Sequence, residues 1–210
     1  MRKIPRQARS RALVDRLVEA TGSVIAARGL EFTTTNHIAA EAGVDIASLY
    51  QYFANKEELI EAWLEHLANQ QIKLAETYLS GIDLAMATPR DIAHGALTLG
   101  LSALRADPVV MELARHWMHL SIHRPMMILE QELLRVAAIY FRQHFHRYPI
   151  EDLHIRLYVL ANSTMATVGR HLSEDRPVIR DEQLIDTLVT MIVLMLTDAT
   201  DVSAQVLAAE

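Results

Sequence analysis

The scarcity of glycine and proline restricts the fold of this chain more than any other feature. Only 7 Gly and 6 Pro occur among 210 residues. Turn-rich β folds and long flexible linkers need many more of these residues. Hydrophobic residues make up 51% of the chain, which is enough for a sizeable core. The remaining composition is rich in Ala, Leu, Glu, Gln, Arg and Met, all of which favour helix. We therefore predict an all-α protein.

Apolar spacing and capping residues predict about nine helices with short connections. Gly29 and Gly43 follow two of them and suit the backbone conformation at a helix end. Asp45 is expected to cap the third, and Asn55 with Glu58 resembles a capping box before the fourth. The expected helices are 9–28, 35–42, 46–53, 56–79, 89–106, 108–122, 125–147, 151–172 and 181–198.

Several function classes are excluded by what the sequence lacks. There is no cysteine, so disulfides, thiolate metal sites and cysteine nucleophiles do not occur. The patterns GxSxG, HExxH, GxGxxG and the P-loop are absent, and we expect neither an enzyme nor a cofactor. Residues 1–20 contain no apolar signal-peptide region, and the run 188–196 is too short to span a bilayer. We expect a cytoplasmic protein without membrane contact.

Charge is distributed unevenly along the chain. The net charge is −6, but residues 1–56 carry 8 Lys/Arg and 5 Asp/Glu, whereas the remainder is strongly acidic. Three basic residues (Arg2, Lys3 and Arg6) form an N-terminal arm. This asymmetry predicts a small basic module at 1–56 and an acidic helical body at 57–210. A basic arm is also common as plain solvated surface, so charge alone does not decide the partner.

The basic module contains two short helices that meet at Gly43. A turn this tight makes the helices cross steeply, which is typical of a helix-turn-helix. We expect the third helix, 46–53, to expose Ala47, Ser48, Gln51 and Tyr52. Small side chains let a helix approach the major groove, a glutamine can read adenine, and hydroxyls can reach phosphates. The alternative is a plain three-helix corner in which the tyrosines are packing residues.

The same stretch resembles the N-terminal signature of TetR-family transcriptional regulators. The residues that carry the resemblance are Gly29, Thr34-Thr35, Ile38-Ala39, Ala42-Gly43-Val44, Leu49-Tyr50-Gln51-Tyr52-Phe53 and Asn55-Lys56-Glu57-Glu58-Leu59. The resemblance implies a three-helix head that binds double-stranded operator DNA, on a larger helical domain for ligand binding and dimerisation. It implies a homodimer that usually represses transcription from a palindromic operator and is released by a small-molecule effector.

The resemblance also implies which residues contact DNA. They are Thr34, Thr35 and Asn36 on the second helix, Ile46, Ala47, Ser48 and Gln51 as recognition positions, and Tyr50, Tyr52 and Lys56 as backbone contacts. Two positions depart from the family pattern, since many members have Ser and then Gly or Pro where this chain has Asp45 and Ala47. Ile46 replaces a frequent polar reader, and either contacts a thymine methyl or turns inward.

The last two expected helices predict dimerisation independently of the resemblance. The final helix is apolar nearly all round, so it must be buried on two sides. One side can pack on its own core and the other on a second chain, or the helix can be fully internal in a monomer. The expected interface residues are Leu157, Leu160, Thr164, Val168, Leu188, Ile192 and Met195.

Aromatic and histidine residues in the body suggest a small-molecule site. Trp117, Phe141, Phe145 and Tyr158 are candidates for an apolar wall, with Arg115, His116 and His119 as polar anchors, although such residues are more often plain core. A helical metal-binding protein or enzyme using Glu and His ligands is the alternative function. His116 and His123 would lie two helical turns apart, about 10 Å, which is too far for one ion, so we expect no metal.

Overall fold

The computed structural model describes residues 7–144 and 150–196, except for the side chains of Met118 and Gln143. Within these ranges it contains nine α-helices, one 3-10 turn and no strand, which confirms the all-α prediction. The helices are α1 (Ala8–Arg28), α2 (Thr35–Glu41), α3 (Ile46–Tyr52), α4 (Lys56–Ser80), α5 (Pro89–Ala106), α6 (Pro108–Ala114), α7 (His123–His144), α8 (Leu153–Leu172) and α9 (Asp181–Leu196). None of them combines the length and hydropathy of a bilayer-spanning segment.

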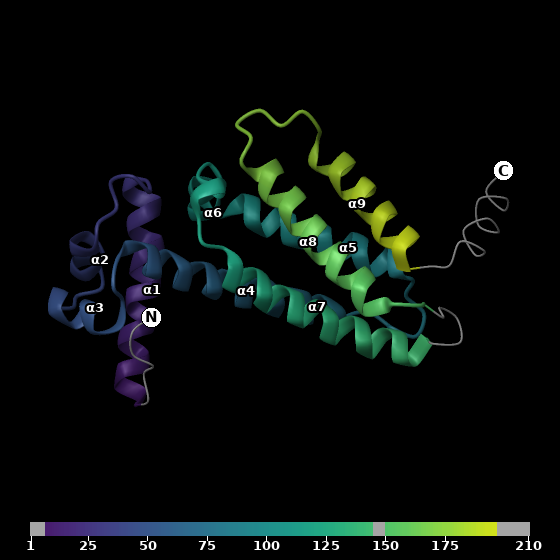
Figure 1. Cartoon of the computed structure of the whole chain (residues 1–210), viewed down its shortest axis with the longest axis horizontal. Helices are drawn as coiled ribbons and strands as arrows, with labels where there is room; N and C mark the ends of the chain where they lie inside the picture. Colours follow the sequence, from purple (N-terminus) through teal and green to yellow (C-terminus); the bar gives the residue numbers. More distant parts are fainter. Residues whose placement is uncertain (1–6, 145–149, 197–210) are drawn as a thin grey trace.

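The helices form a small head and a larger body (Figure 1). The head consists of α1, α2 and α3, and α4 leads from it into the body. In the body α4 packs beside α7, α5 packs beside α9, and α8 lies between α7 and α9. The short helix α6 also packs on α1, so the body contacts the head at a second place besides α4.

One hydrophobic core continues from the head into the body. It includes Leu17, Leu49 and Phe53 of the head together with Leu113 of α6 and Val189 of α9. A second, smaller core lies between α7, α8 and the end of α9, around Phe141 and Leu157. Because the first core crosses from α1 to α6, the head is held by apolar packing as well as by the covalent link through α4.

The predicted sixth helix, 108–122, is wrong in its second half. The α-helix ends at Ala114, a 3-10 turn covers Trp117–His119, and Leu120 is extended. A continuous helix would carry the chain straight on, whereas it must reverse for α7 to pack on α4. The predicted histidine face therefore does not exist: His116 follows α6, His119 ends the 3-10 turn, and His123 begins α7.

The caps match the sequence expectations in part. Thr88 and Asp91 form a capping box at α5, and the Asn55 side chain accepts the N–H of Glu58 at 2.9 Å. Glu58 accepts instead from the N–H of Ala54, at 2.7 Å. Asp45 occupies the N-cap position of α3, but its side chain makes no capping hydrogen bond, so that expectation is wrong. The expected helix ends at 147 and 198 lie outside the described residues.

Candidate nucleic-acid interface

The turn between α2 and α3 is built around Gly43, which has φ +63°. Side chains rarely adopt this left-handed conformation, and glycine does so without a steric cost. Ile38 and Ala39 of α2 and Leu49 of α3 are buried inside the corner. Ala39 has no side chain beyond Cβ, which allows the two helices to cross closely. The corner is therefore fixed by packing, and α3 presents one constant face outward.

The outward face of α3 differs from the predicted one at a single tyrosine. Tyr52 is only 6% exposed and lies with Leu49 on the inward side, three positions away along the helix. The expectation that Tyr52 is exposed is therefore wrong. Ala47, Tyr50 and Gln51 are exposed, with Tyr50 at 42%, and Ser48 is half-buried.

Ile46 resolves an alternative that the sequence leaves open. Its side chain is partly buried and packs against the head core. This is the inward orientation, which removes Ile46 from the most exposed part of α3. The outermost residues at the start of α3 are consequently Asp45 and Ala47.

A hydroxyl pair joins α2 to α3. The Oγ1 atom of Thr35 and the phenolic oxygen of Tyr50 are 3.0 Å apart. Thr34 caps α2 by accepting the N–H of His37 at 3.2 Å, and Asn36 is exposed beside it. We call the set Thr35, Asn36, Ala47, Tyr50 and Gln51 the head surface. It brings together a helix N-terminus, two hydroxyls and two amides, all groups that bind phosphates and base edges.

Lys56 has a partner inside the protein. Its Nζ donates to the backbone oxygen of Leu30 at 3.1 Å, and the side chain is half-buried. The same loop residue is held from the other side, because the N–H of Leu30 donates to Oε1 of Glu112 at 2.9 Å. Gly29, with φ +78°, places this loop against α6. Sequence reasoning missed this clamp, because no local pattern relates residues 82 positions apart.

The charge on the head is basic along α1. Arg9, Arg11 and Arg16 are all exposed on the helix surface. The arm residues Arg2, Lys3 and Arg6 lie outside the described residues. Exposed arginines favour contact with a polyanion by displacing its counterions.

The head has the features of a helix-turn-helix domain. These features are three helices, a glycine turn and an exposed polar face on the third helix. Residues 17–63 match the family model described as bacterial regulatory proteins, tetR family. The head and the start of α4 therefore carry the sequence signature of the tetR family.

Curated relatives match over a short stretch of the chain. The nucleoid occlusion factor SlmA of Haemophilus influenzae (strain PittGG) is 48% identical over 40 residues, which is 19% of this chain and 18% of that protein. The chain thus matches less than a fifth of the length of this relative.

Solved structures match over nearly the whole chain. RolR in complex with the ligand resorcinol has a TM-score of 0.67 and 19% identity, covering 93% of both chains. A TetR transcriptional regulator from Rhodococcus sp. RHA1 has a TM-score of 0.65 and 16% identity, covering 91% of this chain and 99% of that one. FadR of Bacillus subtilis in complex with stearoyl-CoA has a TM-score of 0.60 and 16% identity, covering 86% and 97%. These matches show the fold of the body.

The structure does not gather the predicted ligand residues into one site. Phe141 is buried against Tyr140 in the smaller core, whereas Tyr158 is 56% exposed on α8. Trp117 lies against Gly169, where an added Cβ would meet the indole at 2.5 Å. The three predicted polar anchors lie elsewhere, and Phe145 falls outside the described residues. The structure therefore does not bring the predicted set together as a single site, because Phe141 is buried in the smaller core whereas Tyr158 is exposed on α8.

The predicted polar anchors lie near the clamp or on the surface. Arg115 forms an ion pair with Glu112 at 2.9 Å, and the nearest atoms of His116 and Glu112 are 4.0 Å apart. His119 is exposed. The Glu112 pKa is lowered, first by the hydrogen bond from the Leu30 N–H, with burial opposing and Arg115 assisting. No group of three or more His, Asp or Glu among the described residues is arranged to hold a metal ion.

The predicted dimer residues lie largely inside this chain. Leu157, Leu160 and Leu188 are buried in its own core, and Val168, Ile192 and Met195 pack partly against it. Leu157, Leu160 and Leu188 are therefore core residues of this chain, and a place for them in an interface stays a prediction that the structure does not support. The exposed large apolar side chains of these helices are Ile155, Tyr158 and Val159 on α8 and Leu194 on α9. Both stripes have helical spacing, so periodicity could not tell which one faces inward.

Thr164 is the remaining member of that predicted set, and it is unusual. Its Oγ1 is buried and has no hydrogen-bond partner among the described residues. Thr164 belongs to the inward stripe of α8, one turn beyond Leu160. Residues 162–165, which include Thr164, are half-buried.

Proposed function

We propose that this protein is a DNA-binding transcriptional regulator whose head surface docks in the major groove. The pairing of Thr35 with Tyr50 across α2 and α3 carries the proposal, because it aligns the start of α2 with the outward face of α3. Ala47 allows close approach of the helix, and Gln51 can read an adenine edge. Tyr50, Thr35 and Lys56 supply phosphate contacts, with Lys56 exchanging its bond to Leu30 for one to DNA.

The regulator acts as a homodimer in this proposal. Ile155, Tyr158 and Val159 form an exposed apolar patch on α8, and Leu194 adds to it from α9. An exposed apolar surface of this kind supports association with a second copy of the chain. In the proposed dimer, α8 and α9 of one chain pack against α8 and α9 of the other. A two-fold dimer presents two head surfaces, and therefore fits a palindromic operator with half-sites one or more helical turns apart.

A small, largely apolar effector binds inside the body and releases the DNA. The partnerless Oγ1 of Thr164 and the half-buried middle of α8 support this site, since a bound molecule could satisfy the hydroxyl. The structures of RolR with resorcinol and FadR with stearoyl-CoA support an effector of aromatic or acyl character. Because the effector releases the protein from its operator, the protein acts as a repressor in this proposal. The proposal also takes the protein to be non-enzymatic and cytoplasmic.

Selection from a library of random 30-base-pair duplexes tests the DNA-binding proposal. We expect enrichment of a near-palindromic sequence, bound with an affinity that falls steeply as salt rises. The selected duplex is then titrated with the Gln51→Ala variant and with a control, Asp186→Asn, on the exposed side of α9. Failure of selection to enrich any sequence, with fully folded protein, would contradict the proposal.

A further inference from the structure

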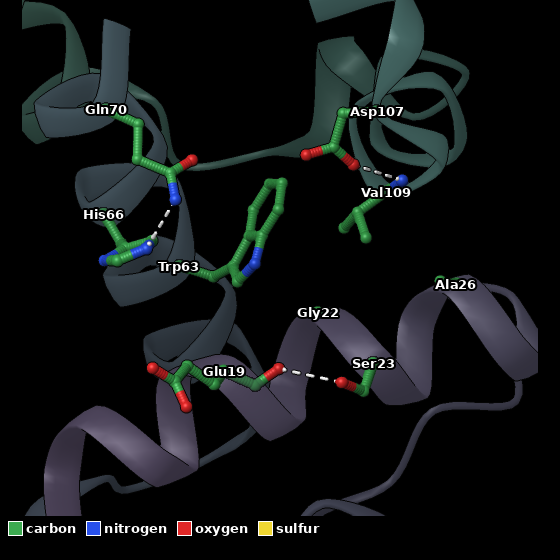
Figure 2. Close-up of a pocket in the computed structure, with 9 residues that line it drawn as sticks. All are labelled: Glu19, Gly22, Ser23, Ala26, Trp63, His66, Gln70, Asp107 and Val109. Atoms are coloured by element: carbon green, nitrogen blue, oxygen red, sulfur yellow. Dashed lines mark hydrogen bonds between the residues drawn. The ribbon is translucent and has the colours of Figure 1, made fainter. Parts of the chain in front are cut away.

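A small open cavity lies where the head meets the body. It has a volume of about 320 Å³ and is bounded by α1, α4 and the turn between α5 and α6. Figure 2 shows Trp63 of α4 in the centre, His66 and Gln70 on one side of it, and Asp107 on the other. This cavity is separate from the middle of α8, and neither the head surface nor the proposed effector site uses it.

The wall of the cavity is an indole held against a helix backbone. Trp63 is almost fully buried, and a Cβ added at Gly22 of α1 would lie 2.4 Å from its Nε1. Only glycine allows the ring to approach α1 this closely. The ring extends into the space between α1 and the α5–α6 turn (Figure 2). Indole presents the most electron-rich face of any side chain, and such a face attracts cations.

The charged groups around the indole are carboxylates. Asp107 and Glu19 line the cavity, and no lysine or arginine does. Asp107 uses Oδ1 to accept the N–H groups of Val109 and Val110, at 2.8 and 3.4 Å. Its Oδ2 has no hydrogen-bond partner in the described part of the chain. Glu19 makes no ion pair with any described residue. The lining therefore holds two carboxylates and the imidazole of His66, and Asp107 is the carboxylate that faces Trp63 across the cavity (Figure 2).

We propose that this cavity binds a small organic cation of the ammonium class. Asp107 provides the counter-ion, Trp63 the cation–π wall, and Glu19 additional negative potential at the rim. The volume lies at the lower end of the range for small-molecule sites, which fits a compact ammonium group better than a long chain. An anion is disfavoured by both carboxylates. A metal ion is disfavoured because the described residues offer no group of three ligands there.

Choline and its neutral isostere 3,3-dimethylbutan-1-ol provide a matched pair of probes. The chain has two tryptophans, so the Trp117→Phe variant leaves Trp63 as the only emitter. At constant ionic strength, we expect choline to change Trp63 emission saturably and the alcohol to bind at least about tenfold more weakly. Calorimetric titration of the unmodified protein repeats the comparison without relying on that variant. No DNA is present, so the result is independent of the proposed DNA-binding function.

Asp107→Asn removes the counter-ion but retains the cap of α6, because asparagine caps as well as aspartate. We expect it to weaken choline binding by about tenfold, which is about 1.4 kcal/mol. Asp186→Asn, which removes a carboxylate from the distant helix α9, should leave the affinity unchanged. Equal affinities for choline and the alcohol, or an Asp107→Asn protein that binds choline normally, would overturn the proposal.

Discussion

The backbone N–H of Leu30 donates a 2.9 Å hydrogen bond to Oε1 of Glu112, which joins the loop after α1 to helix α6. The oxygen of the same residue accepts from Lys56 at 3.1 Å. Both polar atoms of Leu30 are thus satisfied by side chains, one from the body and one from the start of α4. These two bonds hold the loop that leads from α1 to α2 against both α4 and α6.

Truncation of Glu112 should destabilise the protein. Glu112→Ala leaves the partly buried N–H of Leu30 without an acceptor, and we expect a loss of about 1–3 kcal/mol in the free energy of unfolding. Glu112→Gln keeps an amide oxygen in place and should lose less. Urea denaturation of the three proteins measures the difference. An alanine variant as stable as the original would mean that water replaces the carboxylate at no cost.

The lowered pKa of Glu112 predicts a dependence of stability on pH. Because the carboxyl is more acidic when folded, its contribution is fully present above the unfolded value of 4.5 and is lost as pH falls through the lower folded value. The melting temperature of the original protein should therefore drop more steeply below pH 4.5 than that of Glu112→Gln. Parallel melting curves for the two proteins between pH 3 and 6 would contradict the assignment.

The head surface predicts two distinct kinds of DNA-binding defect. Gln51→Ala should change the preference at one base pair per half-site by about 1–3 kcal/mol and leave the salt dependence intact. Lys56→Ala should weaken binding to all sequences and reduce the salt slope by about 1. Fluorescence anisotropy with the selected duplex and single-base variants separates the two. A Lys56→Ala protein with unchanged affinity and slope would indicate that the lysine keeps its bond to Leu30 on DNA.

The exposed patch on α8 predicts which substitutions separate dimerisation from folding. Ile155→Asp should yield a folded monomer, because the side chain is exposed in the single chain and is covered only in the proposed dimer. Leu160→Asp places a carboxylate in this chain's own core, and should unfold it at a cost of several kcal/mol. Sedimentation equilibrium and circular dichroism distinguish the outcomes. Two variants that behave alike would show that α8 does not have separate inner and outer faces in solution.

The packing at Gly169 predicts a further stability effect. An added Cβ would lie 2.5 Å from the indole of Trp117, so Gly169→Ala must displace the ring. Overpacking of this kind costs about 1–3 kcal/mol. Gly43→Ala has open space around it and is strained only by its positive φ. We expect thermal denaturation to show a larger loss of stability for Gly169→Ala than for Gly43→Ala, because only the first must displace a packed ring. An equal or smaller loss for Gly169→Ala would contradict this prediction.

The sequence predicts the helices well because caps and apolar spacing are local signals. Asn55 marks the start of α4, where its side chain accepts the N–H of Glu58, and the helix expected from residue 89 begins there as α5. The choice between faces is not local. Leu160 and Tyr158 both lie on apolar stripes of α8, and only the tertiary packing buries the first and exposes the second. The prediction that Tyr52 is exposed is wrong for the same reason, since the sequence of α3 does not show which of its sides packs against the core.

Contacts between distant segments are the part that sequence reasoning could not supply. The bond from Leu30 to Glu112 and the approach of Trp63 to Gly22 each join helices that are far apart in the chain. Neither residue pair has a recognisable spacing in the sequence. A glycine inside a helix indicates a close approach, but the sequence does not show which residue approaches it. The break after Ala114 has the same origin, because it depends on where α7 must pack.

The continuous core has a consequence for protein engineering. Exchange of heads between regulators of this kind is attractive, since it would join a new operator specificity to an existing effector response. In this chain a graft at residue 56 would cut through a core shared by Leu17, Leu113 and Val189, and would separate Leu30 from Glu112. A functional hybrid would need to carry the contact face of α6 along with the transplanted head, so the unit of exchange is discontinuous in the sequence.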